Sequence, residues 1–196
     1  MLALLLLCFV PLAVAEPITA KCCFPHKFTA VVMENGGLKM PNAPASGIDY
    51  VTHMYADFDN SVMRWDRNGT TGGMPDVQTM YFNYTKHMLH FIKDGQCTPV
   101  TFVAPNPSLC FREGYHYEGR HVLGSKGNNI ISDKWSRTST ATNISMSLYV
   151  SEDCTPLIQI YTDLASAVRA QTILTYTSFS EGVPDDMFNL PDSCQS

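Results

Sequence analysis

Candidate catalytic and metal-binding residues are sparse in this sequence, and two short patterns stand out. His87 and His90 are three residues apart, which brings two imidazoles together on a helix but sends them to opposite faces of a strand. Asp57-Phe58-Asp59-Asn60-Ser61 begins like a calcium loop, although Val62 stands where such a loop needs glycine and Asn68 where it needs glutamate. The first pattern favours ordinary strand histidines. The second leaves two interpretations, a solvated turn or an irregular calcium site.

Two acidic pairs are further candidates for cation binding, and the motifs of several enzyme classes are absent. Glu152-Asp153 and Asp185-Asp186 are further candidates for a hard cation, and no metal ligand is assigned. The sequence has no G-x-S-x-G, no H-E-x-x-H, no phosphate-binding glycine loop and no C-x-x-C. These absences favour a protein that is not an enzyme. A hydrolase is the lesser alternative, and it would need a His–carboxylate pair that only the fold could bring together.

The N-terminal residues predict secretion. Residues 2–14 are almost wholly apolar, and Ala13-Val14-Ala15 matches the small-x-small pattern that precedes a signal-peptidase site. We therefore predict a signal peptide at 1–15 and a single mature domain at 16–196. The apolar run is shorter than the about 20 residues that a membrane span needs, and no later segment is long and apolar enough for one.

Six cysteines follow this leader, and an even number is typical of a disulfide framework in a secreted chain. They are Cys22, Cys23, Cys97, Cys110, Cys154 and Cys194. In an extended segment the adjacent side chains of Cys22 and Cys23 point to opposite faces, so each should reach a different partner. Six cysteines allow 15 pairings, and leaving out a bond between the adjacent pair still leaves most of them open.

Composition narrows the class of partner. The net charge is −5 and there is no dense run of basic residues. The sequence therefore lacks the positively charged region that a nucleic-acid partner would need. Three N-x-S/T sequons begin at Asn68, Asn83 and Asn143, which fits a glycoprotein of the secretory route.

Alternating hydrophobicity predicts a mainly β protein with little helix. In the first expected hairpin, Tyr50, Thr52, Met54, Ala56 and Phe58 share one side of a strand. The expected strands are 50–58, 62–65, 77–84, 87–92, 144–150, 157–161 and 168–179, joined in order as three hairpins and a last strand. We expect loops at 35–49 and 104–129, and a short helix or a bend between strands at 162–171.

Aromatic and methionine side chains are numerous, with nine Tyr, ten Phe, ten Met and two Trp. Such a set suits an adaptable apolar pocket for a lipid or other hydrophobic small molecule. The pocket candidates are Met54, Phe58, Trp65, Met80, Phe82, Tyr84, Phe91 and Tyr149. The alternative is that these side chains are only core, in an extracellular structural or adhesion protein without a pocket.

The order of several cysteine-flanked motifs resembles the ependymin family, and most closely its invertebrate ependymin-related proteins. The motifs are C-C-F-P from Cys22, A-D-F-D-N-S-V-M-R from Ala56, K-D-G-Q-C to Cys97, D-K-W from Asp133, V-S-E-D-C-T-P-L around Cys154 and G-V-P-D-D-M-F-N-L-P-D-S-C to Cys194. Together they span nearly the whole mature chain.

The resemblance implies a strongly bent antiparallel sheet that forms a half-open barrel around a hydrophobic pocket, similar to bacterial lipoprotein carriers. It also implies a secreted or lysosomal glycoprotein without catalysis, associated with lipid binding, calcium binding and cell-matrix adhesion, with homodimers among its members. No cofactor is required, and calcium is the only one implied. For the cysteines, the resemblance implies the pairs Cys22–Cys154 and Cys97–Cys194, which leaves Cys23 with Cys110.

Overall fold

The computed structural model describes most of the chain. The described residues are 22–39, 42, 44–102, 110, 114–139, 144–163 and 169–194. The predicted signal peptide at 1–15 and the sequon at Asn143 lie outside these residues.

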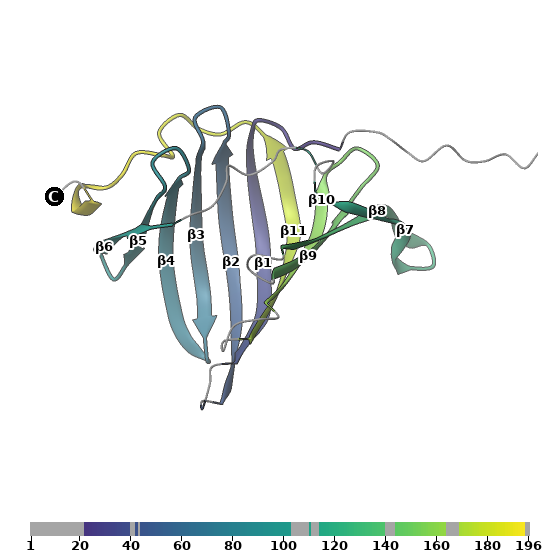
Figure 1. Ribbon diagram of the computed structural model, residues 1–196, viewed down its shortest axis with the longest axis horizontal. Helices are drawn as coiled ribbons and strands as arrows, with labels where there is room; N and C mark the ends of the chain where they lie inside the picture. The colour runs from purple at the N-terminus through teal and green to yellow at the C-terminus, as the bar shows by residue number, and fades with distance from the viewer. Residues whose placement is uncertain are drawn as a thin grey trace, which may run out of the picture.

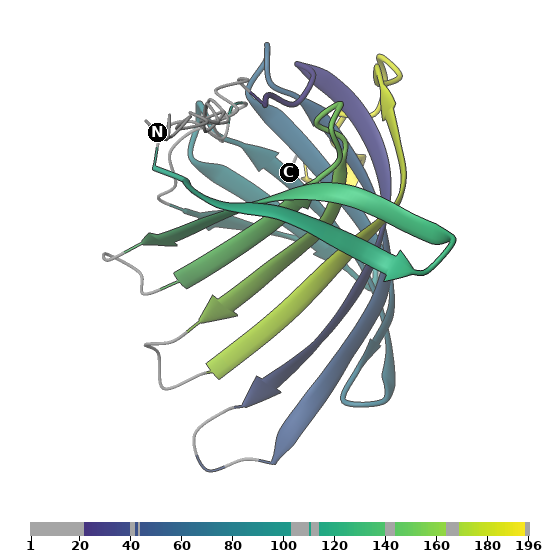
Figure 2. The same ribbon diagram turned by 90° about the vertical axis from the view of Figure 1, so that its right-hand side faces the viewer.

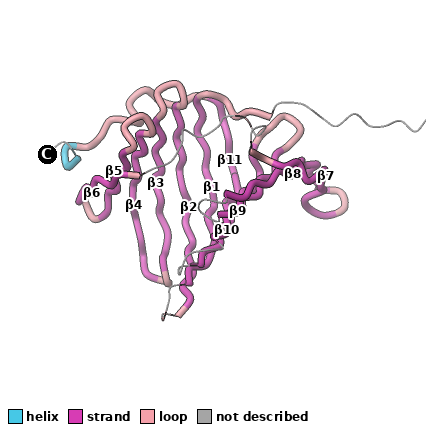
Figure 3. Tube along the Cα trace, in the orientation of Figure 1, coloured by secondary structure: helices cyan, strands magenta, loops and turns pink. Residues whose placement is uncertain are grey.

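Eleven antiparallel strands form one sheet, and the described residues include only one short 3-10 helix, η1 (Asp192–Cys194). The strands are β1 (Lys27–Lys39), β2 (Ala45–Asp57), β3 (Val62–Thr71), β4 (Met74–Asn83), β5 (Met88–Lys93), β6 (Gln96–Thr101), β7 (His116–Ser125), β8 (Asn128–Ser139), β9 (Ile144–Val150), β10 (Pro156–Asp163) and β11 (Arg169–Glu181). Figure 3 shows how little of the described trace is anything but strand. Within the described part of the chain, no helix is long and apolar enough to cross a membrane.

The strands follow one another as a meander whose first and last members are joined. Their order across the sheet is β6-β5-β4-β3-β2-β1-β11-β10-β9-β8-β7, so β1 pairs with β11 and the two edges are β6 and β7. The sheet is strongly bent, and β10 to β7 turn away from the wall that β1 to β6 build (Figure 1). Viewed from the side, the strands follow a curve that is open between the two edges (Figure 2). The predicted mainly β fold, a bent sheet forming a half-open barrel, is confirmed.

The predicted hairpins are confirmed, and their turns have a local explanation. The strands predicted at 50–58, 77–84 and 144–150 correspond to β2, β4 and β9, with ends that differ by a few residues. Each of these strands pairs with the strand that follows it. Between β5 and β6 the two turn residues Asp94 and Gly95 have φ values of 52° and 76°. Positive φ at both central residues is the conformation that matches the twist of a two-residue hairpin.

Two predicted loops are wrong. Residues 35–49 contain the end of β1 and the start of β2, and 104–129 contains all of β7 and the start of β8. Both stretches are rich in Gly, Asn and Ser, residues that commonly mark turns. Here the cross-strand ladder overrides that preference, since Asn35, Gly36 and Gly37 pair with β2 on one side and β11 on the other. At 162–171 the two ends belong to strands, since β10 extends to Asp163 and β11 begins at Arg169, and the expected helix or bend at 164–168 lies outside the described residues.

One face of the sheet, here called the inner face, carries the core. Residues that pair across antiparallel strands share a face, so the register places Ala30, Met54, Trp65 and Met80 together. The main buried cluster consists of Phe28, Ala30, Val32, Met54, Ala56, Met63 and Leu174. On β2, Tyr50, Thr52, Met54 and Ala56 are all buried, as the two-residue alternation predicts.

Candidate ligand-binding site

Large aromatic side chains lie against the buried cluster without being fully covered themselves. They are Phe24, Phe58, Trp65, Phe82, Tyr84, Tyr161, Tyr176 and Phe179, all partly buried. Trp65 and Phe82 contact each other, with ring centroids 5.4 Å apart, and Phe179 contacts the buried ring of Phe28, with centroids 4.9 Å apart. Because these rings are only partly buried above the core, they give the inner face an apolar lining, here called the aromatic lining.

The side chains of Tyr161 and Tyr176 pack against the buried cluster and keep a small solvent-accessible surface. Burial raises the pKa of both phenols far above the usual value, and the nearby phenols of Tyr84 and Tyr115 raise that of Tyr161 further. The two hydroxyls converge on Gln159, whose Nε2 donates to the Tyr161 oxygen at 2.7 Å and whose Oε1 accepts from Tyr176 at 3.0 Å. These three side chains therefore place a small neutral hydrogen-bonding group within the apolar lining.

A charged pair occupies the inner face beside the aromatic lining. The guanidinium of Arg67 makes two bonds to the buried carboxylate of Glu34, at 3.0 Å and 2.6 Å. The same guanidinium lies 3.9 Å from the ring centroid of Tyr50. A bidentate carboxylate and a stacked ring give a buried guanidinium partners for its charge and for its N–H donors. This pair links β1 and β3 across β2.

A second polar group surrounds Asp76 on the same face. Tyr50 and Thr71 donate their hydroxyl protons to its Oδ2, and the ammonium of Lys93 lies 2.9 Å from its Oδ1. Together these bonds lower the pKa of Asp76 to about 2. Gln78 Nε2 donates to the Tyr50 oxygen at 3.1 Å, so the Tyr50 hydroxyl is fixed from two sides.

Both polar groups were missed in the sequence analysis, although Tyr50 was assigned to the correct face. Glu34, Tyr50, Arg67 and Asp76 come from four different strands. No spacing within one strand could have brought them together, since their proximity depends on how four strands pair.

A cavity lies at one end of the sheet and takes lining residues from both faces, Leu38, Asp163 and Ala170 from the inner face and Gly37, Lys39, Ala45, Thr162 and Gln171 from the opposite face. It measures about 550 Å³ and lies where β1 ends, β2 begins, β10 ends and β11 begins. Leu38 and Ala170, which share the inner face by register, contribute apolar surface to its lining. Cavities of roughly 300–1,000 Å³ are the usual size of small-molecule sites.

Seven of the eight predicted pocket residues are associated with the inner face. Met54, Trp65, Met80, Phe82 and Phe91 share it by register. Phe58 and Tyr84, in the turns that follow β2 and β4, pack against the same cluster.

The prediction for Tyr149 is wrong. Tyr149 pairs with Lys134 and Ile158 on the opposite face, here called the outer face. Its neighbours Leu148 and Val150 are the buried ones. Because side chains alternate along a strand, a one-residue error in assigning the inward positions of β9 moves the aromatic ring to the wrong side.

The outer face has a cavity of its own, which the sequence did not predict. The C-terminal segment, residues 182–194, crosses the outer face of β3 to β5 and encloses about 410 Å³ with Tyr81, Met88 and His90 on one side and Phe188 and Leu190 on the other. Arg64 of β3 donates to the Met187 carbonyl at 3.1 Å. The segment therefore covers Tyr81, which is buried.

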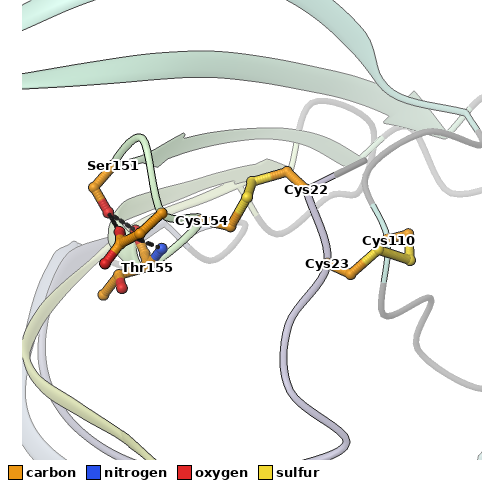
Figure 4. The surroundings of a disulfide bond; sticks show 7 residues. Cys22, Cys23, Cys110, Ser151, Cys154 and Thr155 are labelled. Carbon is orange, nitrogen blue, oxygen red and sulfur yellow. Dashed lines mark hydrogen bonds between the residues drawn. A yellow bond between two sulfur atoms is a disulfide. The ribbon is translucent and has the colours of Figure 1, made fainter. Parts of the chain in front are cut away.

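Three disulfides tie the ends of the chain to the sheet. They join Cys22 to Cys154, Cys23 to Cys110 and Cys97 to Cys194, the pairing that the family resemblance implies. Figure 4 shows the adjacent Cys22 and Cys23 reaching in different directions, as expected of neighbours in an extended segment. Cys22 packs with Leu148 and Val150 in a second buried cluster, so this disulfide also contributes apolar surface.

Two of the predicted cation candidates, Asp57 and Asp153, are engaged in ordinary contacts. Asp57 contacts Lys27 at 3.0 Å and accepts from the backbone and side chain of Asn60, so it stabilises the turn after β2. The Asp153 carboxylate accepts hydrogen bonds from the Ser151 hydroxyl and from the Thr155 backbone N–H. In the described ranges no three His, Cys, Asp or Glu side chains group as a metal site would require.

The histidine patterns do not form a site either. His87 lies in the turn between β4 and β5, and His90 faces outward on β5 opposite Tyr81. A His–carboxylate contact does occur elsewhere, between His26 Nδ1 and Asp59 Oδ1 at 2.7 Å. Both of these side chains are more than half exposed, at 67% and 53%, so the pair lies in solvent outside the apolar lining.

The two sequons among the described residues differ in their surroundings. Asn68 is exposed on the outer face of β3, between Val51 and Val77 of the flanking strands. Asn83 is half-buried at the end of β4, and its Oδ1 accepts from the Lys86 backbone at 2.8 Å.

Several solved structures align with most of this chain. An uncharacterized conserved protein from Thermus thermophilus aligns with a TM-score of 0.54 and 14% identity, covering 87% of this chain and 88% of its own. A LolA superfamily protein from Nitrosomonas europaea gives 0.42 and 13%, covering 86% and 93%. A beta-barrel-like protein from Brucella abortus gives 0.39 and 4%, covering 82% and 100%. At these identities the likeness concerns the fold alone. Curated protein sequences gave no match.

The family model for the ependymin domain in its amoebozoan form matches residues 40–196. The sequence resemblance points to invertebrate ependymin-related proteins, whereas the matched model is the amoebozoan one, so the two agree on the family and differ on the subgroup. The match covers most of the chain, including ten of the strands from β2 onward and the last cysteine. The chain therefore belongs to the ependymin family.

Proposed function

We propose that this protein is a secreted glycoprotein without catalysis that binds a lipid or another hydrophobic small molecule on the inner face of its bent sheet. The observation that carries the proposal is the set of aromatic side chains that lie deep on this face and yet keep accessible surface, with Trp65, Tyr161 and Tyr176 at its centre. Exposing apolar rings costs free energy that a bound apolar ligand would recover.

The distribution of polar groups suits a ligand with one polar end. The aromatic lining lies beside the Glu34–Arg67 pair and the Asp76 group, and the cavity of about 550 Å³ at the ends of β1 and β10 offers a way in. A fatty acid or similar amphipathic molecule fits this division between apolar and polar surface.

Ligand binding can be tested with delipidated protein and a fluorescent fatty-acid probe. We expect saturable binding, and we expect Leu38→Arg to weaken it by about tenfold or more, because the new charge lies in the cavity at the strand ends. Val77→Arg is the matched control, since it places the same charge on the outer face at a side chain that is 61% exposed.

The alternative is an extracellular structural or adhesion protein whose inner face is only core. Lipid extraction of the purified native protein followed by mass spectrometry separates the two. Absence of any bound lipid, together with no saturable probe binding, would contradict the proposed pocket and favour the adhesion interpretation.

Secretion, calcium binding and cell-matrix adhesion enter the proposal through the family and the sequence. The three disulfides support an oxidising compartment, extracellular or lysosomal. For calcium, we expect the melting temperature of the deglycosylated protein to rise on adding calcium ions. No change would assign calcium binding to the sugars or remove it from the proposal. A homodimer is a further family expectation, which sedimentation equilibrium can measure.

A further inference from the structure

The charged groups described so far on the inner face are neutralised by their own partners. Arg67 contacts Glu34 at 2.6 Å, and Lys93 contacts Asp76 at 2.9 Å. Arg120 of β7 is likewise paired, with two acidic side chains. The carboxylate of a ligand would have to compete with these partners for any of the three cations.

Arg137 of β8 differs from them. It pairs with Met146 of β9, which pairs with Tyr161 of β10, so the register places Arg137 on the inner face. These neighbouring strands belong to the part of the sheet that turns away from the wall of β1 to β6 (Figure 1). The Arg137 side chain is exposed, and among the described residues no carboxylate, that of Asp163 on the same face included, forms an ion pair with it. Its charge is therefore available to a ligand.

The guanidinium of Arg137 is held beside the aromatic lining. Its Cζ atom lies 5.8 Å from the centroid of the Tyr115 ring, and its Nε would lie 3.6 Å from a Cβ atom on Gly114. Burial raises the pKa of Tyr115, and the positive charge of Arg137 opposes this rise. The Tyr115 hydroxyl donates to the Met146 sulfur at 3.4 Å, and Gln159 Nε2 donates to the same sulfur at 2.8 Å. A continuous row of contacts therefore leads from Arg137 to Gln159 within the lining.

We propose that Arg137 binds the carboxylate of a single-chain carboxylic acid whose apolar tail lies on the aromatic lining. This inference rests on the ligand site proposed above and specifies the residue that recognises the polar end. Arg137 and Tyr161 are two strands apart on one row, which is about 10 Å at the usual spacing of strands, a distance that an acyl chain spans. The guanidinium fork matches the two oxygens of a carboxylate, whereas the fork of Arg67 is already occupied by Glu34.

The test compares an acid with its neutral analogue in the delipidated mature protein. Displacement of Nile red, an uncharged fluorescent probe of apolar surfaces, measures the binding of dodecanoate and of dodecanol at neutral pH. We expect the wild type to bind dodecanoate about tenfold more tightly than dodecanol, because only the acid forms a charge-assisted bond with Arg137. Arg137→Gln should remove this preference and leave the affinity for dodecanol unchanged.

Lys126→Gln is the matched control, since it removes one positive charge from an exposed side chain in the turn after β7. This variant should keep the wild-type preference for the acid. Arg137→Lys should keep part of the preference, because an ammonium group supplies the charge without the fork. Thermal unfolding by circular dichroism checks that each variant is folded.

The outcomes separate this inference from the function on which it rests. If the wild type binds both ligands equally, or if Arg137→Gln keeps the preference, the inner face binds apolar chains but Arg137 is not the partner of the carboxylate. Equal loss of the preference in Arg137→Gln and Lys126→Gln would assign it to the net charge of the protein. Weaker binding of both ligands to a folded Arg137→Gln would give this side chain a packing role instead. Absence of binding of either ligand to the wild type would contradict the proposed function together with the role of Arg137.

Discussion

Among the described residues, Asp76 is the carboxylate whose pKa is lowered most by its neighbours. Its pKa falls from 3.8 to about 2 because the Tyr50 hydroxyl and the Lys93 ammonium both bind the charged form. An acid with a depressed pKa in the folded state stabilises the fold above its unfolded pKa, and this contribution is lost as the pH falls through the folded pKa. The loss therefore occurs between about pH 4 and pH 2.

We expect Asp76→Asn to reduce the pH dependence of stability in that window. The wild type should lose up to about 2 kcal/mol from this group between pH 4 and pH 2, and the variant should lack that portion while being less stable at pH 7. Urea unfolding at a series of pH values measures it. Tyr50→Phe removes one donor and should reduce the same slope in part. A slope unchanged in both variants would show that Asp76 is not held ionised in this way.

At the scale of elements, the contact between β2 and β3 depends on a residue without a side chain. A Cβ atom on Gly69 would lie 1.9 Å from the Asp49 carbonyl oxygen and 2.7 Å from the Tyr50 Cα. Both are backbone atoms of the neighbouring strand, so no side-chain movement relieves the overlap. The pairing of Gly69 with Tyr50 therefore requires glycine at this position.

We expect Gly69→Ala to lower the free energy of unfolding by about 2 kcal/mol or more, because β2 and β3 must separate locally to accommodate the methyl group. Gly37→Ala is the control, since a Cβ there meets nothing within 4 Å. Urea unfolding of both variants is the measurement. Because Gly69→Ala leaves Asn68 and Thr70 in place, the sequon is unaffected. Equal stabilities would mean that the two strands do not approach as closely as described.

The element scale also shows the limit of local sequence patterns. Alternation identified most of β2, β4 and β9, because a half-buried strand repeats every two residues. The same rule missed the first part of β2 and all of β7, where glycine and other turn-forming residues interrupt the pattern. These segments are strands because their backbones are paired on a long ladder, a cause that lies outside the segment itself.

At the scale of the whole molecule, the Cys97–Cys194 disulfide holds the C-terminal segment on the outer face. It joins β6, an edge strand, to η1 across 97 residues of sequence. The Cys23–Cys110 disulfide spans a similar 87 residues but anchors the other end of the chain. In the chain-entropy model, two loops of such similar length restrict the unfolded chain to nearly the same degree.

We expect Cys97→Ser/Cys194→Ser to lower the free energy of unfolding by about 4 to 5 kcal/mol and to expose the C-terminal segment to limited proteolysis. Cys23→Ser/Cys110→Ser should cost a similar amount while leaving that segment protected. Urea unfolding and mass spectrometry of the cleavage products give the two readouts. If the segment stayed protected without Cys97–Cys194, its contacts with Arg64 and Tyr81 would be sufficient by themselves.

The sequence by itself determined the mainly β class, the inward residues of β2 and the family, because alternation and motif order are written along a single chain. The inner face that carries the proposed function was only partly accessible from sequence. Trp65 and Phe82 were assigned from their residue types, whereas Tyr149 was assigned to the wrong side. Only the tertiary structure decided that Glu34 meets Arg67, that Asp76 meets Lys93, and that Arg137 lies on the inner face beside Tyr115. The physical reason is that these features depend on the register and the ends of pairing between strands distant in sequence, which no local periodicity encodes.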